Sequence, residues 1–384
     1  LHTAPQAIVN ILWAFATVRV WDEELVCGLG SKIQQQLCYS SDSMSSGKLR
    51  PQHIANALWA LASFEYKSEV TTALFESARL RAHEFQTQEL SLVMWSLAKL
   101  HVVDKPLLQA CMKSAGTQME CFSAVGMSNV LWSLGTLLCS CTVSKHFTFQ
   151  STAVAMDRLA ELSTQTIAAI MWAYARMQHH DGRLFKLVPA QMLVHLSECS
   201  SSDLARTAWA FATLAWRDVA FCDGLAADVT VRSRMHELSV NELASLVWSF
   251  ATLLVRDPPA CLAVQLEAEA RAMEFGAWGL ASMLWAFATL RELHEDKVIG
   301  LSARSVSLIE QFTPQGVAMM AWACSAAGFA DSSLWAALAA AARQVASEFN
   351  PEEVQMTIHA FLGCGYWDTA LVILQSCRAR ACKD

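Results

Sequence analysis

One short helical signature recurs along the whole chain, and this repetition limits the possible folds more than any other feature. Nine copies are centred on a tryptophan, and His359 holds the same place in a tenth. The tryptophan anchors are Trp13, Trp59, Trp95, Trp132, Trp172, Trp209, Trp248, Trp285 and Trp322. Successive anchors lie 36–40 residues apart, except for a first spacing of 46. A fixed period of this size is typical of a solenoid, in which each unit buries its apolar face on its neighbours.

The residues around each anchor follow one helical pattern. The position five before the anchor is always apolar, and the position one after it is always Ala or Ser. The position two after it is large and apolar in nine of the ten copies. Because the apolar residues recur at steps of three and four, the pattern predicts one α-helix per copy, which we call the first helix. Its small residues let another backbone approach closely, so we expect each first helix to be packed between its neighbours.

The start of the first helix is also marked in the sequence. Nine residues before the anchor, many copies carry a capping residue: Ser123, Ser163, Ser200, Ser239, Thr313 and Asn350. Asp203, Glu242 and Glu353 follow three residues later, where a capping box places an acid. About twenty residues with helical spacing of their own, such as 69–83, separate one first helix from the next. Each copy is therefore predicted to be a helix–turn–helix.

These patterns predict an all-α protein, a right-handed α-solenoid of about ten helix–turn–helix repeats of about 37 residues. We expect residues 1–384 to form a single tandem array with no separate catalytic domain. A Ser-rich loop from Tyr39 to Gly47 accounts for the one long spacing. The approximate repeats are 4–49, 50–85, 86–122, 123–162, 163–199, 200–238, 239–275, 276–312, 313–349 and 350–384.

Composition excludes several classes of protein. Hydrophobic residues make up 54% of the chain and charged residues 16%, as expected when helices are buried on two sides. No uncharged apolar run is long enough to span a membrane, so we expect no membrane insertion. The thirteen cysteines form no C-x-x-C pair, which favours buried free thiols in a reducing compartment over disulfides or zinc. The chain opens at Leu1 without Met, so we interpret it as a fragment.

The sequence offers no convincing catalytic constellation. His179, His180 and Asp181 are the only dense cluster of metal-type side chains, and they lie in a predicted turn between helices. A solvated turn is the favoured interpretation of this cluster. We therefore expect a protein that is not an enzyme and that needs no cofactor and no metal.

A polar stripe along the first helices is the most informative surface feature. The positions seven before, three before and four after each anchor fall on one narrow side of the helix, and we call them the first-helix stripe. Amides, hydroxyls and basic side chains predominate there, and such groups can hydrogen-bond the edges of unpaired bases. The candidate RNA-contacting residues are Asn10, Thr17, Asn56, Ser63, Gln88, Lys99, Asn129, Thr136, Gln165, Arg176, Arg206, Thr213, Ser245, Thr252, Ser282 and Thr289.

The alternative is that the stripe is polar only because it is exposed. Charge favours a binding surface: the chain has 35 acidic residues and a net charge of −7, yet Glu352 is the only acid in the stripe. Three basic residues, Lys99, Arg176 and Arg206, lie there as well. We expect the tryptophans to pack between adjacent repeats, and the alternative is an aromatic shelf on which bases stack.

The repeated segments of the chain resemble those of a known group of proteins. The segments Asn56–Leu61 (NALWAL), Asn129–Leu134 (NVLWSL), Leu246–Leu253 (LVWSFATL) and Met283–Leu290 (MLWAFATL) are similar to repeats of organellar RNA-binding proteins. These are the octotricopeptide and heptatricopeptide families, with the related repeats of FAST-kinase-like and RAP-domain proteins and of RNA-editing substrate-binding complexes. The resemblance covers essentially the whole chain.

The resemblance implies an α-solenoid in mitochondria or plastids that binds single-stranded RNA. It also implies a role in RNA processing, stability, editing or translation, together with other proteins of an organellar ribonucleoprotein complex. The rival hypothesis is a protein-interaction scaffold of the HEAT or armadillo kind. It is supported by the negative net charge and by an apolar stripe near the end of the chain, at Met319, Ala326, Met356 and Gly363.

Overall fold

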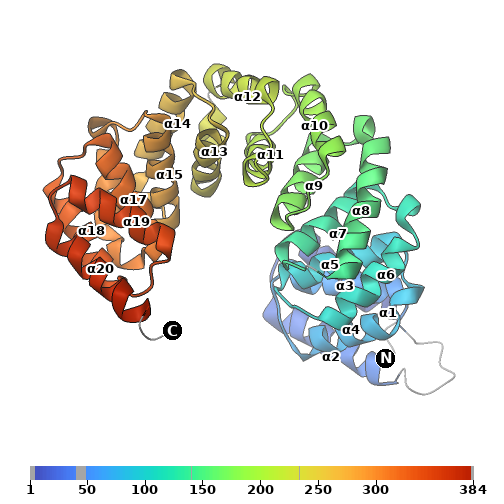
Figure 1. Cartoon of the computed structure of the whole chain (residues 1–384). Helices are drawn as coiled ribbons and strands as arrows, with labels where there is room; N and C mark the ends of the chain where they lie inside the picture. The colour runs from blue at the N-terminus through green and yellow to red at the C-terminus, as the bar shows by residue number, and fades with distance from the viewer. Residues whose placement is uncertain (1–4, 40–48, 140, 233, 382–384) are drawn as a thin grey trace. The chain divides into compact units, whose positions relative to one another are not determined.

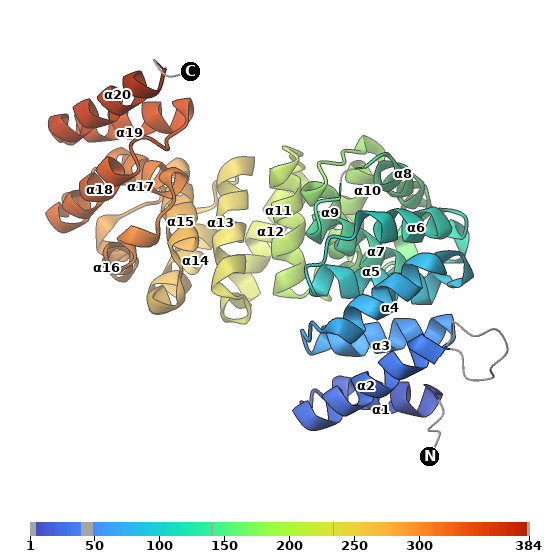
Figure 2. The ribbon, with the colours of Figure 1, turned by 90° about the horizontal axis from the view of Figure 1, so that it is seen from below.

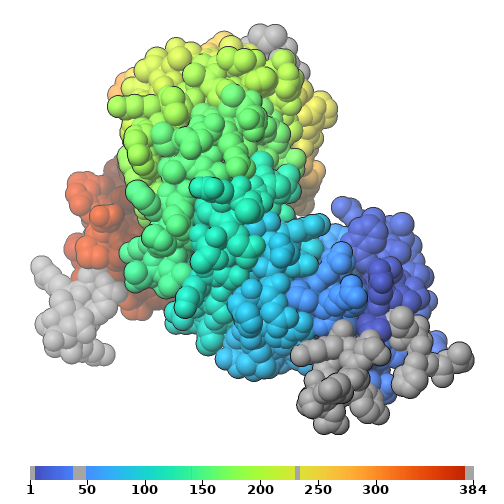
Figure 3. Space-filling model, turned by 90° about the vertical axis from the view of Figure 1, so that its right-hand side faces the viewer, coloured from blue at the N-terminus to red at the C-terminus, as the bar shows by residue number. Residues whose placement is uncertain are grey.

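The computed structural model describes residues 5–39, 49–139, 141–232 and 234–381, so most of the predicted Ser-rich loop lies outside the described residues. Within these ranges the chain forms twenty α-helices and seven short 3₁₀ helices, with no strand (Figure 1). The helices cluster into two compact units, residues 1–191 and 192–384, with the division inside α10. The space-filling view shows successive repeats of the first unit following one another from blue to green (Figure 3).

Unit 1 contains two layers of helices that alternate along the chain. Its first helices are α1 (Pro5–Thr17), α3 (Pro51–Ser63), α5 (Thr87–Lys99), α7 (Ala124–Thr136) and α9 (Thr164–Arg176). Its second helices are α2 (Glu23–Tyr39), α4 (Glu69–Leu80), α6 (Lys105–Gly116), α8 (Thr142–Asp157) and α10 (Gly182–Val194). The first helices α1, α3, α5 and α7 also pack on the second helix of their own repeat, as for α1 with α2 and α3 with α4 (Figure 2).

Unit 2 repeats this arrangement. Its first helices are α11 (Ser201–Thr213), α13 (Val240–Leu253), α15 (Ala277–Leu290), α17 (Pro314–Ala327) and α19 (Pro351–Gly363). Its second helices are α12 (Val219–Arg232), α14 (Pro258–Ala270), α16 (Ile299–Ser307), α18 (Ser332–Gln344) and α20 (Trp367–Ala381). In both units, successive first helices pack on each other, and successive second helices do the same less extensively. The predicted all-α solenoid of helix–turn–helix repeats is confirmed.

Small residues explain why the first-helix layer is the tighter one. The residue one after the anchor is buried in every repeat except the first, as at Ala60, Ser133 and Ala210. The residue two after the anchor, such as Phe250, is enclosed completely in every repeat except the first, where Phe15 is half-buried. Side chains of this size dominate core energetics, so the predicted sandwiching of first helices is confirmed.

The predicted caps are present. Ser123, Ser163, Ser200, Ser239, Thr313 and Asn350 each accept a hydrogen bond from the main-chain N–H three residues later. Glu242 and Glu353 complete the reciprocal half of the capping box, whereas Asp203 does not. The Asp203 prediction was therefore wrong. Its side chain is buried in the repeat and does not turn back to the cap.

Every first helix ends in the same left-handed turn, which the sequence did not reveal. In all ten repeats of the described chain, the residue six after the anchor has a positive φ. The next residue's N–H bonds the carbonyl five residues before it, at 2.8–3.1 Å. This is the Schellman geometry that satisfies the last carbonyls of a helix. Eight of the ten residues are not glycine, as at Leu138 and Ala215, so no glycine signal marked the turn.

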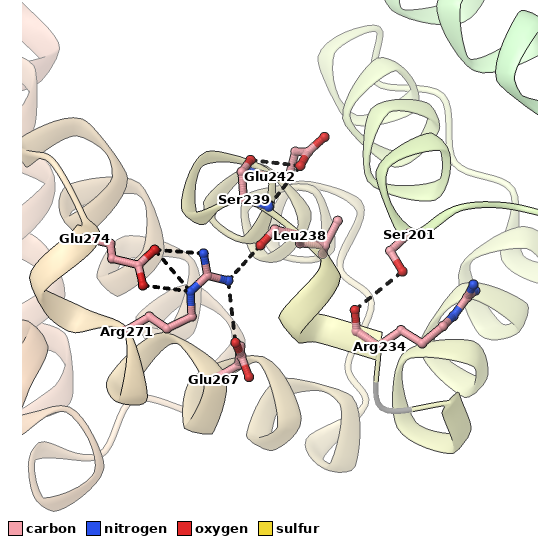
Figure 4. Close-up of polar contacts among 8 residues, drawn as sticks. All are labelled: Ser201, Arg234, Leu238, Ser239, Glu242, Glu267, Arg271 and Glu274. Carbon is pink, nitrogen blue, oxygen red and sulfur yellow. Dashed lines mark hydrogen bonds and ion pairs between the residues drawn. The ribbon is translucent and has the colours of Figure 1, made fainter.

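Arginines in the second-helix layer connect one repeat to the next. Arg81, Arg158 and Arg271 follow α4, α8 and α14. Each donates to the main-chain carbonyl of the residue that ends the preceding repeat (Leu49, Phe122 and Leu238), at 2.7–3.1 Å. Figure 4 shows Arg271 bonded to the Leu238 carbonyl and held by the carboxylates of Glu267 and Glu274. Because a guanidinium has several donors in a fixed plane, one side chain can satisfy a carbonyl and an acid together.

Candidate nucleic-acid interface

The first-helix stripe lies on the surface of both units, and its three rows differ in exposure. The row seven before the anchor is exposed in every described repeat except at Ser202, which is half-buried. The row three before is mostly half-buried, as at Asn56 and Asn129. The row four after varies between exposed, as at Arg176, and half-buried, as at Lys99. We call the row seven before the anchor the outer row. A ligand lying along the first helices would meet this row first.

The amide side chains of the stripe have no partner inside the described protein. None of the terminal amides at Asn10, Asn56, Asn129, Gln88 and Gln165 makes a hydrogen bond to another described residue. The same holds for Gln6 and Gln52, which share the outer row with Gln88 and Gln165. Each amide offers two N–H donors and one carbonyl acceptor. Unit 1 thus presents rows of unused planar hydrogen-bonding groups.

The hydroxyls of the stripe differ from the amides because their donors are already used. Each hydroxyl of one set donates to the carbonyl four residues earlier in its own helix, at 2.8–2.9 Å: Thr17, Ser63, Ser245, Thr252 and Thr289. The Oγ1 atoms of Thr136 and Thr213 are buried without a partner. The hydroxyls of the first set can therefore only accept a hydrogen bond from a ligand, and the two buried Oγ1 atoms are out of its reach. The amides are the better candidates for reading bases.

Ser282 is a correction to the predicted set. Its side chain is 2% exposed, because α15 is apolar nearly all round and this position packs inward. A serine is small enough to be enclosed where an asparagine would not be. Ser282 therefore lies beneath the surface and is removed from the candidate RNA contacts.

The stripe is less positive than its own residues suggested. The Lys99 ammonium lies 2.6 Å from the Glu65 carboxylate, and the hydrogen bond from Lys99 holds the Glu65 pKa below its usual range. The Arg206 guanidinium lies 3.8 Å from Glu242. Burial raises the Glu242 pKa, but hydrogen bonds from Ser202 and Ser239 outweigh it and leave that pKa lowered. Both acids lie outside the three stripe positions, so the charge count along the sequence did not include them.

Arg176 is held differently from the other two cations. Its Nε donates to the Gly135 carbonyl of the preceding repeat at 3.4 Å. Its guanidinium carbon lies 5.8 Å from the centre of the Trp172 ring, a distance at which a cation is attracted to the ring face. Because it pairs with no described acid, Arg176 keeps more of its charge available than Lys99 or Arg206.

The tryptophan anchors contact one another between repeats. Ring centres are 6.0 Å apart for Trp13 and Trp59, and 6.3 Å apart for Trp59 and Trp95. The Trp132–Trp172 and Trp285–Trp322 pairs lie at 6.5 and 6.4 Å. The internal anchors are half-buried, and Trp13 is 45% exposed. The rings therefore pack between repeats and also leave an edge at the surface beside the amide rows.

The His179–His180–Asp181 turn is more structured than the solvated turn that we expected. His179 is half-buried, with Nε2 3.3 Å from the Thr152 hydroxyl and its ring against Tyr174, and burial lowers its pKa. Asp181 accepts hydrogen bonds from the side chain and N–H of Arg183, which lower its pKa to about 2. Among the described residues, no group of three or more His, Cys, Asp or Glu side chains is arranged to hold a metal ion.

Two further observations concern the rest of the described chain. No helix there is both long enough and apolar enough to cross a bilayer. The ten cysteines that the structure describes are free, and burial raises the pKa of Cys111 and Cys324 to about 12.

Stacked helix–turn–helix repeats with a polar stripe along one helix layer define a helical-repeat α-solenoid. A family model described as RNA-editing substrate-binding complex 6 protein matches residues 150–368, more than half of the chain. The chain belongs to this family. No curated protein matches it. Of the groups that the sequence resembles, the match supports the repeats of RNA-editing substrate-binding complexes.

Proposed function

We propose that this protein binds single-stranded RNA along the first-helix stripe and acts as a non-enzymatic subunit of an RNA-editing complex. The family name supports an editing complex with RNA and other proteins as partners. Of the two organelles considered from the sequence, the family favours the mitochondrion. The octotricopeptide-like mode, in which each repeat contacts one base, is the model for this binding.

The unpartnered amides carry the proposal. Asn10, Asn56 and Asn129 occupy the same position in three repeats of unit 1, with glutamines in the adjacent outer row. Asn and Gln can donate to and accept from one base edge together, a geometry suited to adenine. A purely structural stripe has no need for planar donor–acceptor pairs repeated in register. An unpaired base satisfies both halves of the amide.

The charges of the stripe determine how strongly the proposed binding depends on salt. Because Lys99 and Arg206 already face acids, few phosphates would be neutralised. The three cations of the stripe set an upper limit of roughly three phosphates, so the slope of log affinity against log salt would be shallow, at about −0.7 per phosphate on single strands. Affinity would therefore come mainly from hydrogen bonds and stacking. At one base per repeat over repeats one to eight, the footprint would be on the order of eight nucleotides.

The test uses the full chain and a selection from random single-stranded RNA, followed by affinity measurements on the enriched sequences. Replacing Asn56 and Asn129 with Ala should weaken binding by roughly tenfold or more, since a good bidentate contact is worth about 1–3 kcal/mol. It should also change the preferred sequence. Gln109→Ala on α6 is the matched control, because this exposed amide also lacks a partner but lies in the second-helix layer.

The scaffold hypothesis has an observation of its own. In the last two repeats the stripe carries Met319, Ala326, Met356 and Gly363 in place of polar residues, a surface better suited to protein than to RNA. If no RNA sequence is enriched and no binding is detected even at low salt, the protein-interaction scaffold becomes the better account of the whole stripe.

A further inference from the structure

Trp278 is the most exposed tryptophan of the first helices, and it lies on the outer row of the stripe. It is 57% exposed at the position seven before the anchor of the eighth repeat. The tryptophan that serves as the structural anchor of this repeat is Trp285, which packs against Trp322. In the other repeats the outer row holds Gln6, Gln52, Gln88, Val125, Gln165, Ser202, Asn241, Gln315 and Glu352.

The fold gives Trp278 no evident packing role. Its ring contacts no other aromatic ring among the described residues. Five repeats place glutamine at this position and still form the same helix with the same neighbours. The position is therefore suited to contact with something outside the chain.

The surroundings of Trp278 combine an aromatic face with unused amides. A hollow of about 70 Å³ lies between the start of α15 and the start of α17, lined by Trp278, Ala281, Phe312, Gln315 and Met319 among others. The Gln315 amide has no partner among the described residues, and neither has that of Asn241, which holds the same position in the repeat before that of Trp278. The hollow has room for about two water molecules, so it can take the edge of a heterocycle but not a whole ring.

We propose that Trp278 and Gln315 form a nucleobase subsite, in which an unpaired base of single-stranded RNA stacks on the Trp278 indole. This proposal rests on the RNA binding proposed above and assigns it a second kind of contact. The edge of the base lies over the hollow, where the Gln315 amide donates to it and accepts from it. Adenine is the preferred base, because its edge offers an acceptor and a donor side by side. Stacking alone would accept any base, since every base has a π-face.

The experiment measures binding of fluorescently labelled single-stranded RNA to the full chain by anisotropy, for four variants. Trp278→Ala and Trp278→Gln should each weaken binding roughly tenfold, because neither side chain offers a ring for stacking. Trp278→Phe should retain most of the affinity. Trp367→Ala on α20 is the matched control, since Trp367 is also a highly exposed tryptophan, at 62%, in the second-helix layer, and this variant should bind normally. Circular dichroism should show the same helicity for all four.

A second readout locates the base directly. RNA carrying 5-iodouridine, irradiated in complex with the full chain, should cross-link to the peptide that contains Trp278. Gln315→Ala should leave the cross-link in place, because stacking accepts any base, but should reduce the preference for adenine at the stacked position. If wild-type protein binds RNA and Trp278→Ala binds equally well, the subsite is refuted while RNA binding stands. If wild-type protein binds no RNA, both proposals fail together.

Discussion

The two units of the molecule share one scaffold but present different chemistry along the first-helix stripe. Unit 1 carries rows of unpartnered amides, at Asn10, Asn56 and Asn129 and in the glutamines of the outer row. In the stripe, unit 2 has unpartnered amides only at Asn241 and Gln315, together with methionines, the exposed Trp278 and hydroxyls whose donors are used, as at Thr252. Unit 1 therefore offers more amide hydrogen bonds, and unit 2 offers more apolar and aromatic contact.

The difference shows that packing and surface chemistry are specified by separate positions of the repeat. Positions next to the anchor remain small or apolar in both units because neighbouring helices enclose them. Stripe positions are free of that constraint and can vary. The family match covers residues 150–368 and thus excludes most of the amide-rich part of unit 1.

The largest expected effect concerns the tryptophan contacts. Trp59 lies between the rings of Trp13 and Trp95, whereas Trp248 in unit 2 contacts no aromatic ring among the described residues. Trp59→Ala should lower the free energy of unfolding by about 3 kcal/mol and Trp248→Ala by about 2 kcal/mol, near or below the usual range because both are half-buried. Urea denaturation followed by circular dichroism measures both. Equal losses would show that ring contacts add nothing in unit 1.

A smaller effect is expected at the position two after the anchor. In unit 1, Tyr174 is fully buried and its hydroxyl lies 3.1 Å from that of Ser151 and 3.0 Å from that of Thr152. In unit 2 the same position is phenylalanine in four of the five repeats, as at Phe250. Tyr174→Phe should cost about 1–2 kcal/mol, because it removes a buried hydrogen-bond partner. Phe250→Tyr should cost about as much, because it buries a hydroxyl with no such polar cluster.

The pKa of Tyr174 provides a control for this prediction. Burial raises that pKa from 10.0 to about 12, so the folded state favours the neutral phenol. The resulting stability is complete below pH 10 and is lost as the pH rises through about 12. Tyr174→Phe should abolish this part of the alkaline destabilisation, measured as the change in urea midpoint between pH 9 and pH 11. An unchanged pH profile would contradict burial of the phenol.

Substitutions at the left-handed turns should change the stability of the protein in opposite directions in the two units. Leu138 has a φ of 49° in unit 1, and Gly328 has a φ of 72° at the same repeat position in unit 2. Leu138→Gly should stabilise the protein by up to about 1 kcal/mol, and Gly328→Ala should destabilise it by about 1 kcal/mol. Thermal denaturation detects shifts of this size. Destabilisation by Leu138→Gly would mean that the leucine side chain contributes more than the backbone strain costs.

The smallest effect is electrostatic and tests the acids that neutralise the stripe. Glu65→Gln removes the partner of Lys99 in unit 1 without disturbing a helix cap. The released ammonium would contact one more phosphate, so the slope of log affinity against log salt should steepen by about 0.7. Lys99→Met should leave the slope unchanged, because the wild-type ammonium already faces Glu65. A slope that is the same in Glu65→Gln and wild type would show that Lys99 does not face the RNA.

Much of the fold follows from the sequence because the repeat shows each signal ten times. The period, the caps at residues such as Ser163, and the small residues after each anchor are local patterns in one register. The turns could not be predicted because glycine is the usual signal of a positive φ, whereas residues such as Leu138 adopt that conformation here. The roles of Glu65 and Glu242 could not be predicted because each lies in a different repeat from the cation that it neutralises. Ser282 was misplaced because helical spacing does not show how wide the buried side of a helix is.

The two helix layers are held by different means, and this has a mechanical consequence within each unit. First helices touch along their length through alanines and serines, whereas second helices are joined in part by single side chains such as Arg81 and Arg271. We expect thermal bending to open the arginine-linked layer before the alanine-lined one. The layer of first helices would then keep its length while the layer of second helices lengthens or shortens. The tryptophan rings in this layer, whose centres are 6.0–6.5 Å apart, would therefore keep their spacing when the unit bends.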